Sequence, residues 1–275
     1  MRRLRLSPRL VIGGTIVVLL VVIAALAPLI APYDPLDVVT ARRLQPPSFA
    51  NLFGTDDLGR DIFSRVLWGS RVSLSVGLIS VSIGLFVGAT LGIISGFRGG
   101  WFDLLAMRAI DALLAFPPLV LAISITAVLG PQLQNAMIAI GILAIPTYAR
   151  LARGQVLALR HRDFVLAARS VGVPPSRVVW RHVFPNMVNP LIVAASLSAG
   201  FAILAEAGLS FLGLGAQPPT PSWGQDIAYS QRQVMLGRWW AVAAPGTAIF
   251  LAILAFNMLG DGLRDLLDPR MRRSG

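Results

Sequence analysis

Long runs of apolar residues without a charge divide this chain, and they restrict its fold more than any other feature. The first run, Leu10–Ala31, has 22 residues, which is enough for a helix to cross roughly 30 Å of hydrocarbon at about 1.5 Å per residue. Only 13% of the residues are charged, whereas soluble domains carry about a quarter. These features predict an all-α fold, that of a polytopic helical membrane protein.

Six transmembrane helices account for the apolar runs. After the first we place them near Val72–Phe97, Leu104–Leu129, Asn135–Tyr148, Asn189–Gly213 and Trp239–Leu259. Pro117 and Pro118 must break or kink the third, because each removes a backbone hydrogen-bond donor. The second has a small residue at every fourth position, which predicts that another helix approaches this face closely. These residues are Ser80, Gly84, Gly88, Gly92 and Gly96.

The basic residues indicate how the helices are oriented. All 24 are arginines, and if both termini are cytoplasmic, 17 of them lie on the inner side and 7 on the outer side. Basic residues favour the cytoplasmic side, so we predict a multi-pass protein of the inner (plasma) membrane with both termini in the cytoplasm. Residues 1–71 would then comprise a cytoplasmic tail, the first helix and an extracytoplasmic segment. Residues 72–265 would hold the other helices with a cytoplasmic loop at 150–186, and residues 266–275 a second cytoplasmic tail.

Composition excludes several kinds of chemistry. Without lysine the chain lacks the P-loop residue that reaches the terminal phosphates of ATP. Without cysteine it has no thiolate nucleophile or ligand, and its histidines, His161 and His182, are not at the spacing of paired metal ligands. We therefore expect no enzyme activity and no cofactor in this chain. We also expect no nucleic-acid partner, because the net charge of +11 follows membrane sidedness.

The cytoplasmic loop has more structure than a connection requires. Its sequence predicts a helix over Arg160–Val171, a left-handed cap at Gly172, and a second short helix that begins near Pro175 and stops before Pro185. This order of helix, glycine, paired prolines and helix suggests a surface built for another protein.

The residues of the first loop helix suit a partner's groove. Ala167 and Ala168 have small side chains that would let the helix enter such a groove. Nearby arginines could pair with the carboxylates of that partner; they are Arg162, Arg169, Arg177 and Arg181. Anionic lipid headgroups would also explain the charges, but they do not explain the order of the helices and turns.

This loop resembles the EAA loop of ABC importer permeases. The likeness rests on Leu166-Ala167-Ala168, on Gly172, and on the end of the loop, Arg181–Asn186 (RHVFPN). Leu166 stands in place of the family's glutamate, and His182 and Phe184 stand in place of aliphatic residues. In the dipeptide/oligopeptide/nickel branch the glutamate is commonly absent and the loop ends R-H-x-x-P-N, so the departures favour that branch.

Three other regions resemble the C-type permease subunit of the same branch, in the same order along the chain. The first is Phe53–Asp61 (FGTDDLGRD), and the second is Arg108-x-x-Asp111 with the following Phe116-Pro117. The third is Glu206–Gly215 (EAGLSFLGLG), followed by Pro221–Gly224 (PSWG).

The resemblance implies the partners of such a permease subunit. The chain would enclose one pathway with a homologous B-type permease subunit, and an extracytoplasmic substrate-binding protein would deliver the cargo. Two cytoplasmic ATPase subunits, which bind ATP and Mg, would dock on the loop, and membrane lipid would surround the spans. The cargo stays open among dipeptides, oligopeptides, glutathione-like molecules and nickel complexes.

In such a subunit the loop acts as a coupling helix, which transmits ATP-driven movement to the spans and alternates the access of the pathway. The residues that we assign to this role are Arg162, Asp163, Ala167, Ala168, Arg169, Gly172, Arg181, His182, Pro185 and Asn186.

Glu206, the only glutamate, lies inside the fifth predicted span, where a charged side chain costs about 2.5–3.5 kcal/mol on insertion scales. It could face the pathway, pair with an arginine of the partner subunit, or lie in a wetted outer vestibule. An alternative function follows from it, that of a proton-coupled secondary transporter using Glu206. In the third span, Arg108 and Asp111 are one helical turn apart, and we expect them to pair with each other.

Other possibilities remain at this stage. Ser210 suggests an intramembrane hydrolase, although its surroundings do not match Gly-x-Ser-x-Gly and both histidines lie outside the membrane. A structural scaffold without a transport role is a further alternative. The outer segments, Pro32–Arg71 and Ala216–Arg238, would receive a binding protein or would only seal the outer gate.

Overall fold

The computed structural model describes residues 7–267, and within that range the chain folds into helices and loops without an extended strand. Part of each predicted cytoplasmic tail lies outside the described residues. These parts are Arg2, Arg3 and Arg5 at the N-terminus and residues 268–275 of the predicted tail 266–275. The fold class predicted from the apolar runs, an all-α membrane protein, is confirmed.

Among the described residues, five helices are long and apolar enough to cross a membrane. They are α1 (Pro8–Ile30), α2 (Ile62–Arg98), α5 (Leu133–Leu159), the continuous helix Pro175–Phe211, of which α8 is Phe184–Phe211, and α10 (Trp240–Leu267). A sixth span consists of α3 (Gly100–Leu114) and α4 (Pro118–Leu129), if this bent pair is counted as one. The two halves meet at 93°, which confirms the predicted break at Pro117 and Pro118.

Several spans are longer than their apolar runs indicated, α2 and α5 among them. Helix α2 begins at Ile62 rather than near Val72, because the carboxylate of Asp61 accepts a hydrogen bond from the backbone N of Ser64 at 2.8 Å and caps the helix. Helix α5 continues past Tyr148 to Leu159. Both helices are therefore longer than the roughly 20 residues that a transmembrane helix needs.

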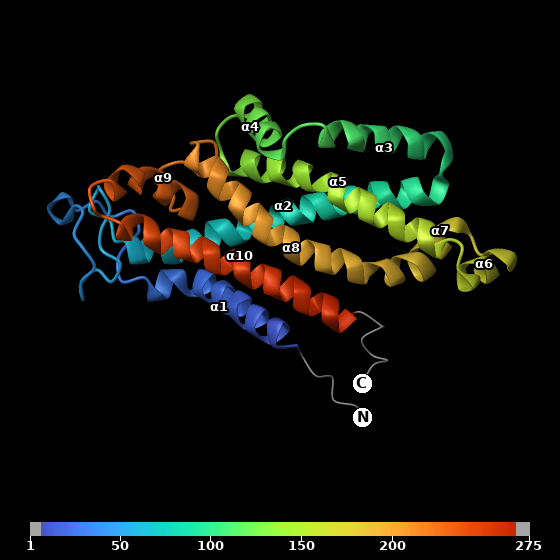
Figure 1. The fold of residues 1–275 in the computed structure, drawn as a ribbon, viewed down its shortest axis with the longest axis horizontal. Helices are drawn as coiled ribbons and strands as arrows, with labels where there is room; N and C mark the ends of the chain where they lie inside the picture. Colours follow the sequence, from blue (N-terminus) through green and yellow to red (C-terminus); the bar gives the residue numbers. More distant parts are fainter. Residues whose placement is uncertain (1–6, 268–275) are drawn as a thin grey trace.

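The long helices run side by side along the long axis of the molecule (Figure 1). At one end of the bundle are the short helices α6 (Asp163–Ser170) and α7 (Pro175–Val178), and at the opposite end are α9 (Trp223–Val234) and the segment between α1 and α2, which contains a single 3-10 turn, η1 (Thr40–Arg42). The predicted cytoplasmic loop and the predicted extracytoplasmic segments are thus separated by the full length of the bundle.

The small residues of α2 form the contact with α5, as their spacing predicted. The hydroxyl of Ser80 donates a hydrogen bond to the carbonyl of Met137 at 2.9 Å. A Cβ atom added at Gly88 would lie 2.5 Å from the carbonyl oxygen of Ile145, and one at Gly96 would lie 3.1 Å from that of Arg153. The two backbones therefore touch along the whole ridge, which leaves no room for larger side chains.

Candidate functional site

Helix α6 is the core of the predicted coupling loop, and it is shorter than the sequence indicated. The backbone of Arg162 is extended, with φ −76° and ψ 145°, so the helix covers Asp163–Ser170 rather than Arg160–Val171. Its end has the hydrogen bonds of a Schellman motif, because the N–H of Gly172 donates to Arg169 and the N–H of Val173 donates to Ala168. Gly172 has φ +76°, which confirms the predicted left-handed cap.

One face of α6 is buried against the rest of the chain. Val165 and Ala168 have 0% and 8% of their surface exposed and pack in the same apolar cluster as Val156, Val178 and Val183. The expectation that Ala168 enters a groove of a partner is therefore wrong for this residue, because Ala168 contacts its own bundle. Ala167 lies on the exposed face, as that expectation requires.

The outward face of the loop is apolar, although it lies at an end of the bundle. Phe164 and Leu166 expose 43% and 45% of their surface, and Val171 beside the cap exposes 79%. Exposed apolar patches of this kind mark protein contacts. The charged residues Arg162 and Asp163 at the start of α6 are also exposed, so the loop offers a partner both apolar and charged groups.

The arginines of the loop differ in whether they contact the rest of the chain. The guanidinium of Arg169 lies 4.9 Å from the ring centroid of Phe97 at the end of α2, in cation–π geometry. Arg177 and Arg181 are exposed. The contact of Arg169 fastens α6 to α2, so this residue supports the loop in addition to presenting a charge.

The second half of the loop is continuous with a membrane span. From Pro175 the chain passes through α7 and a π-helical segment, η2 (Val179–Val183), directly into α8. The prediction that this helix stops before Pro185 is wrong, since Pro185 occupies the first turn of α8, where its missing N–H is not needed. The second half of the loop and the span α8 are thus parts of one continuous helix, Pro175–Phe211.

The predicted coupling residues fall into two groups. Those from Arg162 to Gly172 belong to α6 and its cap, and those from Arg181 to Asn186 belong to the start of the α8 helix. In the second group the side-chain amide of Asn186 donates to the carbonyl of His182 at 2.7 Å, and His182 is half-buried. The apolar cluster that contains Val165 and Val179 joins the two groups.

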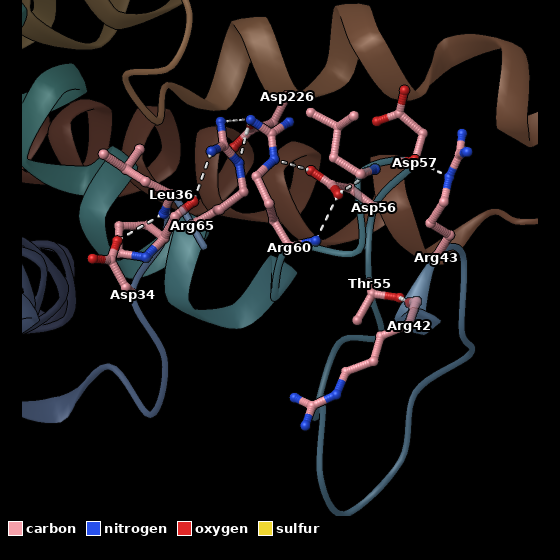
Figure 2. Close-up of polar contacts among 12 residues, drawn as sticks. Asp34, Leu36, Arg42, Arg43, Thr55, Asp56, Asp57, Arg60, Arg65 and Asp226 are labelled. Carbon is pink, nitrogen blue, oxygen red and sulfur yellow. Dashed lines mark hydrogen bonds and ion pairs between the residues drawn. The ribbon is translucent and has the colours of Figure 1, made fainter. Parts of the chain in front are cut away.

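The opposite end of the bundle is held by buried ion pairs (Figure 2). The carboxylate of Asp56 accepts bonds from the backbone N and the Nε of Arg60 at 2.8 Å and 2.6 Å. The guanidinium of Arg65, of which 2% of the side chain is exposed, bonds Asp226 of α9 through Nε at 2.9 Å. Burial raises the pKa of the Asp226 carboxyl, and the charge of Arg65 opposes that rise.

Helix α9 packs against α10 and α8 and also contacts α2. The indole of Trp223 is 1% exposed and donates to the carbonyl of Val66 in α2 at 2.9 Å, while Gly224 packs directly on the backbone of Ala207 in α8. The outer segment Ala216–Arg238 is thus an ordered cap on three spans. The motif Phe53–Asp61 forms the turns and the helix cap beside it.

Glu206 is enclosed by its own chain. Its side chain has no exposed surface, and its Oε1 accepts hydrogen bonds from the hydroxyls of Ser210 at 2.6 Å and Ser222 at 2.9 Å. In this conformation the carboxyl group therefore faces neither the pathway, a vestibule nor a partner subunit. It instead joins α8 to Ser222 at the start of the outer cap.

Two ion pairs between α3 and α5 were missed from the sequence. Asp111 bonds Arg150 at 2.6 Å rather than the expected Arg108, because α5 extends far enough to bring Arg150 alongside α3. Asp103 accepts two bonds from Arg153 at 2.6 Å and 2.7 Å. The sequence shows these charged residues beside apolar runs. It does not show which residues pair, because Arg150 and Arg153 lie in the part of α5 beyond its predicted apolar run.

No group of three or more His, Cys, Asp or Glu side chains that could hold a metal lies together within residues 7–267. The structure combines a loop packed against one end of the bundle, a cap held by ion pairs at the other end, and a close backbone contact between α2 and α5.

Comparison with known proteins identifies relatives along nearly the whole sequence. Residues 88–273 match the family described as binding-protein-dependent transport system inner membrane component, and residues 1–47 match the N-terminal TM domain of oligopeptide transport permease C. The dipeptide transport system permease protein DppC of Alkalihalophilus pseudofirmus is 46% identical over 98% of this chain and 89% of its own length.

Other relatives carry different names. The probable D,D-dipeptide transport system permease protein DdpC of Escherichia coli K12 is 47% identical over 96% of this chain and 88% of its own length. The glutathione transport system permease protein GsiD of Pectobacterium atrosepticum is 43% identical over 95% of this chain and 87% of its own length.

The fold is also similar to that of a solved transporter structure. A chain of the MetNI methionine ABC transporter, in an inward-facing conformation, matches with a TM-score of 0.61 and 16% identity over 75% of this chain and 98% of that chain.

Proposed function

Since this chain belongs to the family of binding-protein-dependent transport system inner membrane components, we propose that it forms half of the translocation pathway of an ATP-driven importer of small peptides. A homologous B-type permease subunit supplies the other half. Two ATPase subunits dock at the α6 end, and an extracytoplasmic binding protein docks at the α9 end.

The observation that carries this proposal is the construction of the coupling loop. An apolar outward face at Phe164, Leu166 and Val171 is combined with an inward face that is sealed against the bundle at Val165 and Ala168. A loop that only connected two spans would need neither. A partner that closes on this surface moves α6 as a solid body, and the continuous helix from Pro175 carries the movement into α8.

The mechanism requires only differential stabilisation of two states. When ATP closes the ATPase dimer, the two coupling loops approach each other, and the spans switch from an inward-facing to an outward-facing arrangement. The binding protein then releases cargo into the pathway, and hydrolysis restores the inward-facing state. This chain makes no covalent bond with the cargo and supplies no catalytic group.

The cargo that we propose is a dipeptide or short oligopeptide. Relatives of similar identity are named for dipeptides, D,D-dipeptides and glutathione, all of which are small molecules with peptide-type amide bonds and charged ends. The proposed class of cargo is therefore defined by the amide bonds and charged ends that these named cargoes share.

Reconstitution tests the proposal. The complete transporter in liposomes, with ATP inside and binding protein with radiolabelled dialanine outside, should accumulate the dipeptide. Omission of ATP or of the binding protein should abolish accumulation, whereas a protonophore should not. Uptake by this chain alone that a protonophore dissipates would instead support the proton-coupled transporter, an alternative that the enclosure of Glu206 by serines does not favour.

A further inference from the structure

The ion pair between Asp111 of α3 and Arg150 of α5 is exposed in an unusual place. The two side chains expose 50% and 54% of their surface, although they lie 2.6 Å apart. Each belongs to a helix that forms part of a membrane span. An ion pair on the outside of a span calls for an explanation, because charged side chains within a membrane normally face a protein interior or a water-filled cavity.

The depth of the pair follows from the helix geometry. Asp111 is eleven residues from Gly100 at the start of α3, and Arg150 is nine residues from Leu159 at the end of α5. At about 1.5 Å per residue, the pair lies about 14–16 Å from the ends of α3 and α5 that point toward α6. The pair therefore lies well inside the length of the bundle, although we predicted that the cytoplasmic loop begins at residue 150.

The surrounding face of α5 is unlike a lipid-facing surface. Its exposed residues at helical spacing around Arg150 are small or polar, namely Thr147, Gly154 and Ala158, and nothing lies within 4 Å of a Cβ added at Gly154. The exposed residues of α1 are large and aliphatic instead; among them are Val18, Leu19, Val21, Leu26 and Leu29. This side of α5 thus lacks the large aliphatic side chains that α1 exposes.

We propose that this face of α5 lines the water-filled pathway, and that Arg150 together with Asp111 of α3 forms a subsite for the charged ends of a peptide. The proposal rests on the peptide-importer function given above and assigns a place in it to two residues. The carboxylate of Asp111 pairs with the ammonium group of the peptide, and the guanidinium of Arg150 pairs with its carboxylate.

The charge balance favours replacement of the Asp111–Arg150 pair by contacts with a zwitterionic peptide. In the absence of cargo the two side chains neutralise each other, so the pathway holds no unpaired charge at this depth. A zwitterionic peptide replaces one ion pair by two without a change in net charge. A partner subunit or a lipid headgroup could also cover this face, and the experiment distinguishes both from water and peptide.

The first measurement is solvent access. The chain has no cysteine, so a single cysteine reports its own position, and mass spectrometry of this subunit separates it from the others. In the reconstituted transporter, a charged methanethiosulfonate reagent should modify Thr147→Cys at least about tenfold faster than Leu19→Cys on α1, since the reagent requires water. Equal protection of both positions would show that a partner or lipid covers the face, and it would overturn the proposal.

The second measurement is protection by peptide, added at millimolar concentration from the side of α6 so that the binding protein is not involved. Dialanine should slow modification of Thr147→Cys. N-acetyl-dialanine and dialanine amide should need about tenfold higher concentrations, the size expected for a lost hydrogen bond between charged groups. Equal protection by all three peptides, or by none, would overturn the subsite.

Variants then assign the two roles. In the Thr147→Cys background, Asp111→Asn should remove the difference between dialanine and its N-acetyl form, and Arg150→Gln the difference between dialanine and its amide. If both variants alter labelling equally for every peptide, and the exchange Asp111→Arg with Arg150→Asp restores it, the pair is only structural. Failure of wild-type dialanine uptake would refute the importer function, whereas the labelling pattern would still decide the access of this face.

Discussion

Replacing Gly92 with alanine tests the backbone contact that joins α2 to α5. A Cβ at Gly92 would lie 2.9 Å from the Cβ of Ala152 and 2.9 Å from the backbone N of Arg153, and it would overlap the carbonyl oxygen of Ala149. Two of these neighbours are backbone atoms, so no side-chain rotation relieves the contact and the helices must separate. Overpacking of this kind costs about 1–3 kcal/mol.

Gly246→Ala in α10 is the matched control, because nothing lies within 4 Å of a Cβ at that position. Both variants gain helix propensity, about 1 kcal/mol in each case. Since this gain is common to both, the difference in their free energies of unfolding isolates the clash and should equal about 1–3 kcal/mol. Gly96→Ala should fall between them, because its nearest neighbours are 3.1 Å away.

The assay is an SDS titration of each variant in detergent micelles, followed by far-UV circular dichroism. We expect the unfolding midpoint of Gly92→Ala to lie below that of Gly246→Ala. Equal midpoints would mean that α2 and α5 separate without cost, and the account of the small-residue ridge as a close backbone contact would then be refuted.

Three further predictions concern the loop and the cap. Gly172→Val should uncouple ATP hydrolysis from dipeptide uptake, because a left-handed conformation costs a β-branched residue at least about 1–2 kcal/mol, whereas Gly172→Asn should stay coupled. Rates of uptake and of ATP hydrolysis, measured together, test this prediction, and normal uptake by the valine variant would contradict it. Asp226→Asn should destabilise the protein by about 3–5 kcal/mol, since the charge of Arg65 is left buried without an opposite charge. Thermal unfolding should show a smaller loss of stability for Arg65→Met combined with Asp226→Leu. Unchanged stability of the single variant would disprove the role of the pair. Glu206→Gln should retain dipeptide uptake because the acceptor for Ser210 and Ser222 is kept, and loss of uptake would show that the carboxyl group acts beyond its contacts with these serines.

The spans and their close contacts could be predicted because each depends on local properties of the sequence. Apolar length indicates a helix that crosses hydrocarbon, paired prolines break a helix wherever they occur, and small residues repeated every four positions must share one face. The left-handed turn at Gly172 belongs to the same class, since its conformation depends on the glycine and the helix that ends there.

The partners of the charged residues could not be predicted in this way. Arg108 and Asp111 are close in sequence, but Asp111 pairs with Arg150 because α5 continues beyond its apolar run. Ala168 has the same side chain as Ala167, and only the packing of α6 on the bundle decides that one is buried and the other exposed. The sequence suggested three surroundings for Glu206: the pathway, a partner subunit or a wetted vestibule. The fold instead buries its side chain inside its own subunit, where Ser210 and Ser222 donate to it.

The sequence by itself therefore determined which segments cross the membrane, where the third span breaks, which face of α2 receives another helix, and the family to which the chain belongs. Only the tertiary structure decided which charges meet, which face of α6 is free, and where the carboxyl group of Glu206 lies. The reason is physical: helix formation and membrane insertion depend on neighbours within a few residues, whereas an ion pair or a buried face depends on the rotation and length of two helices that are far apart in the chain.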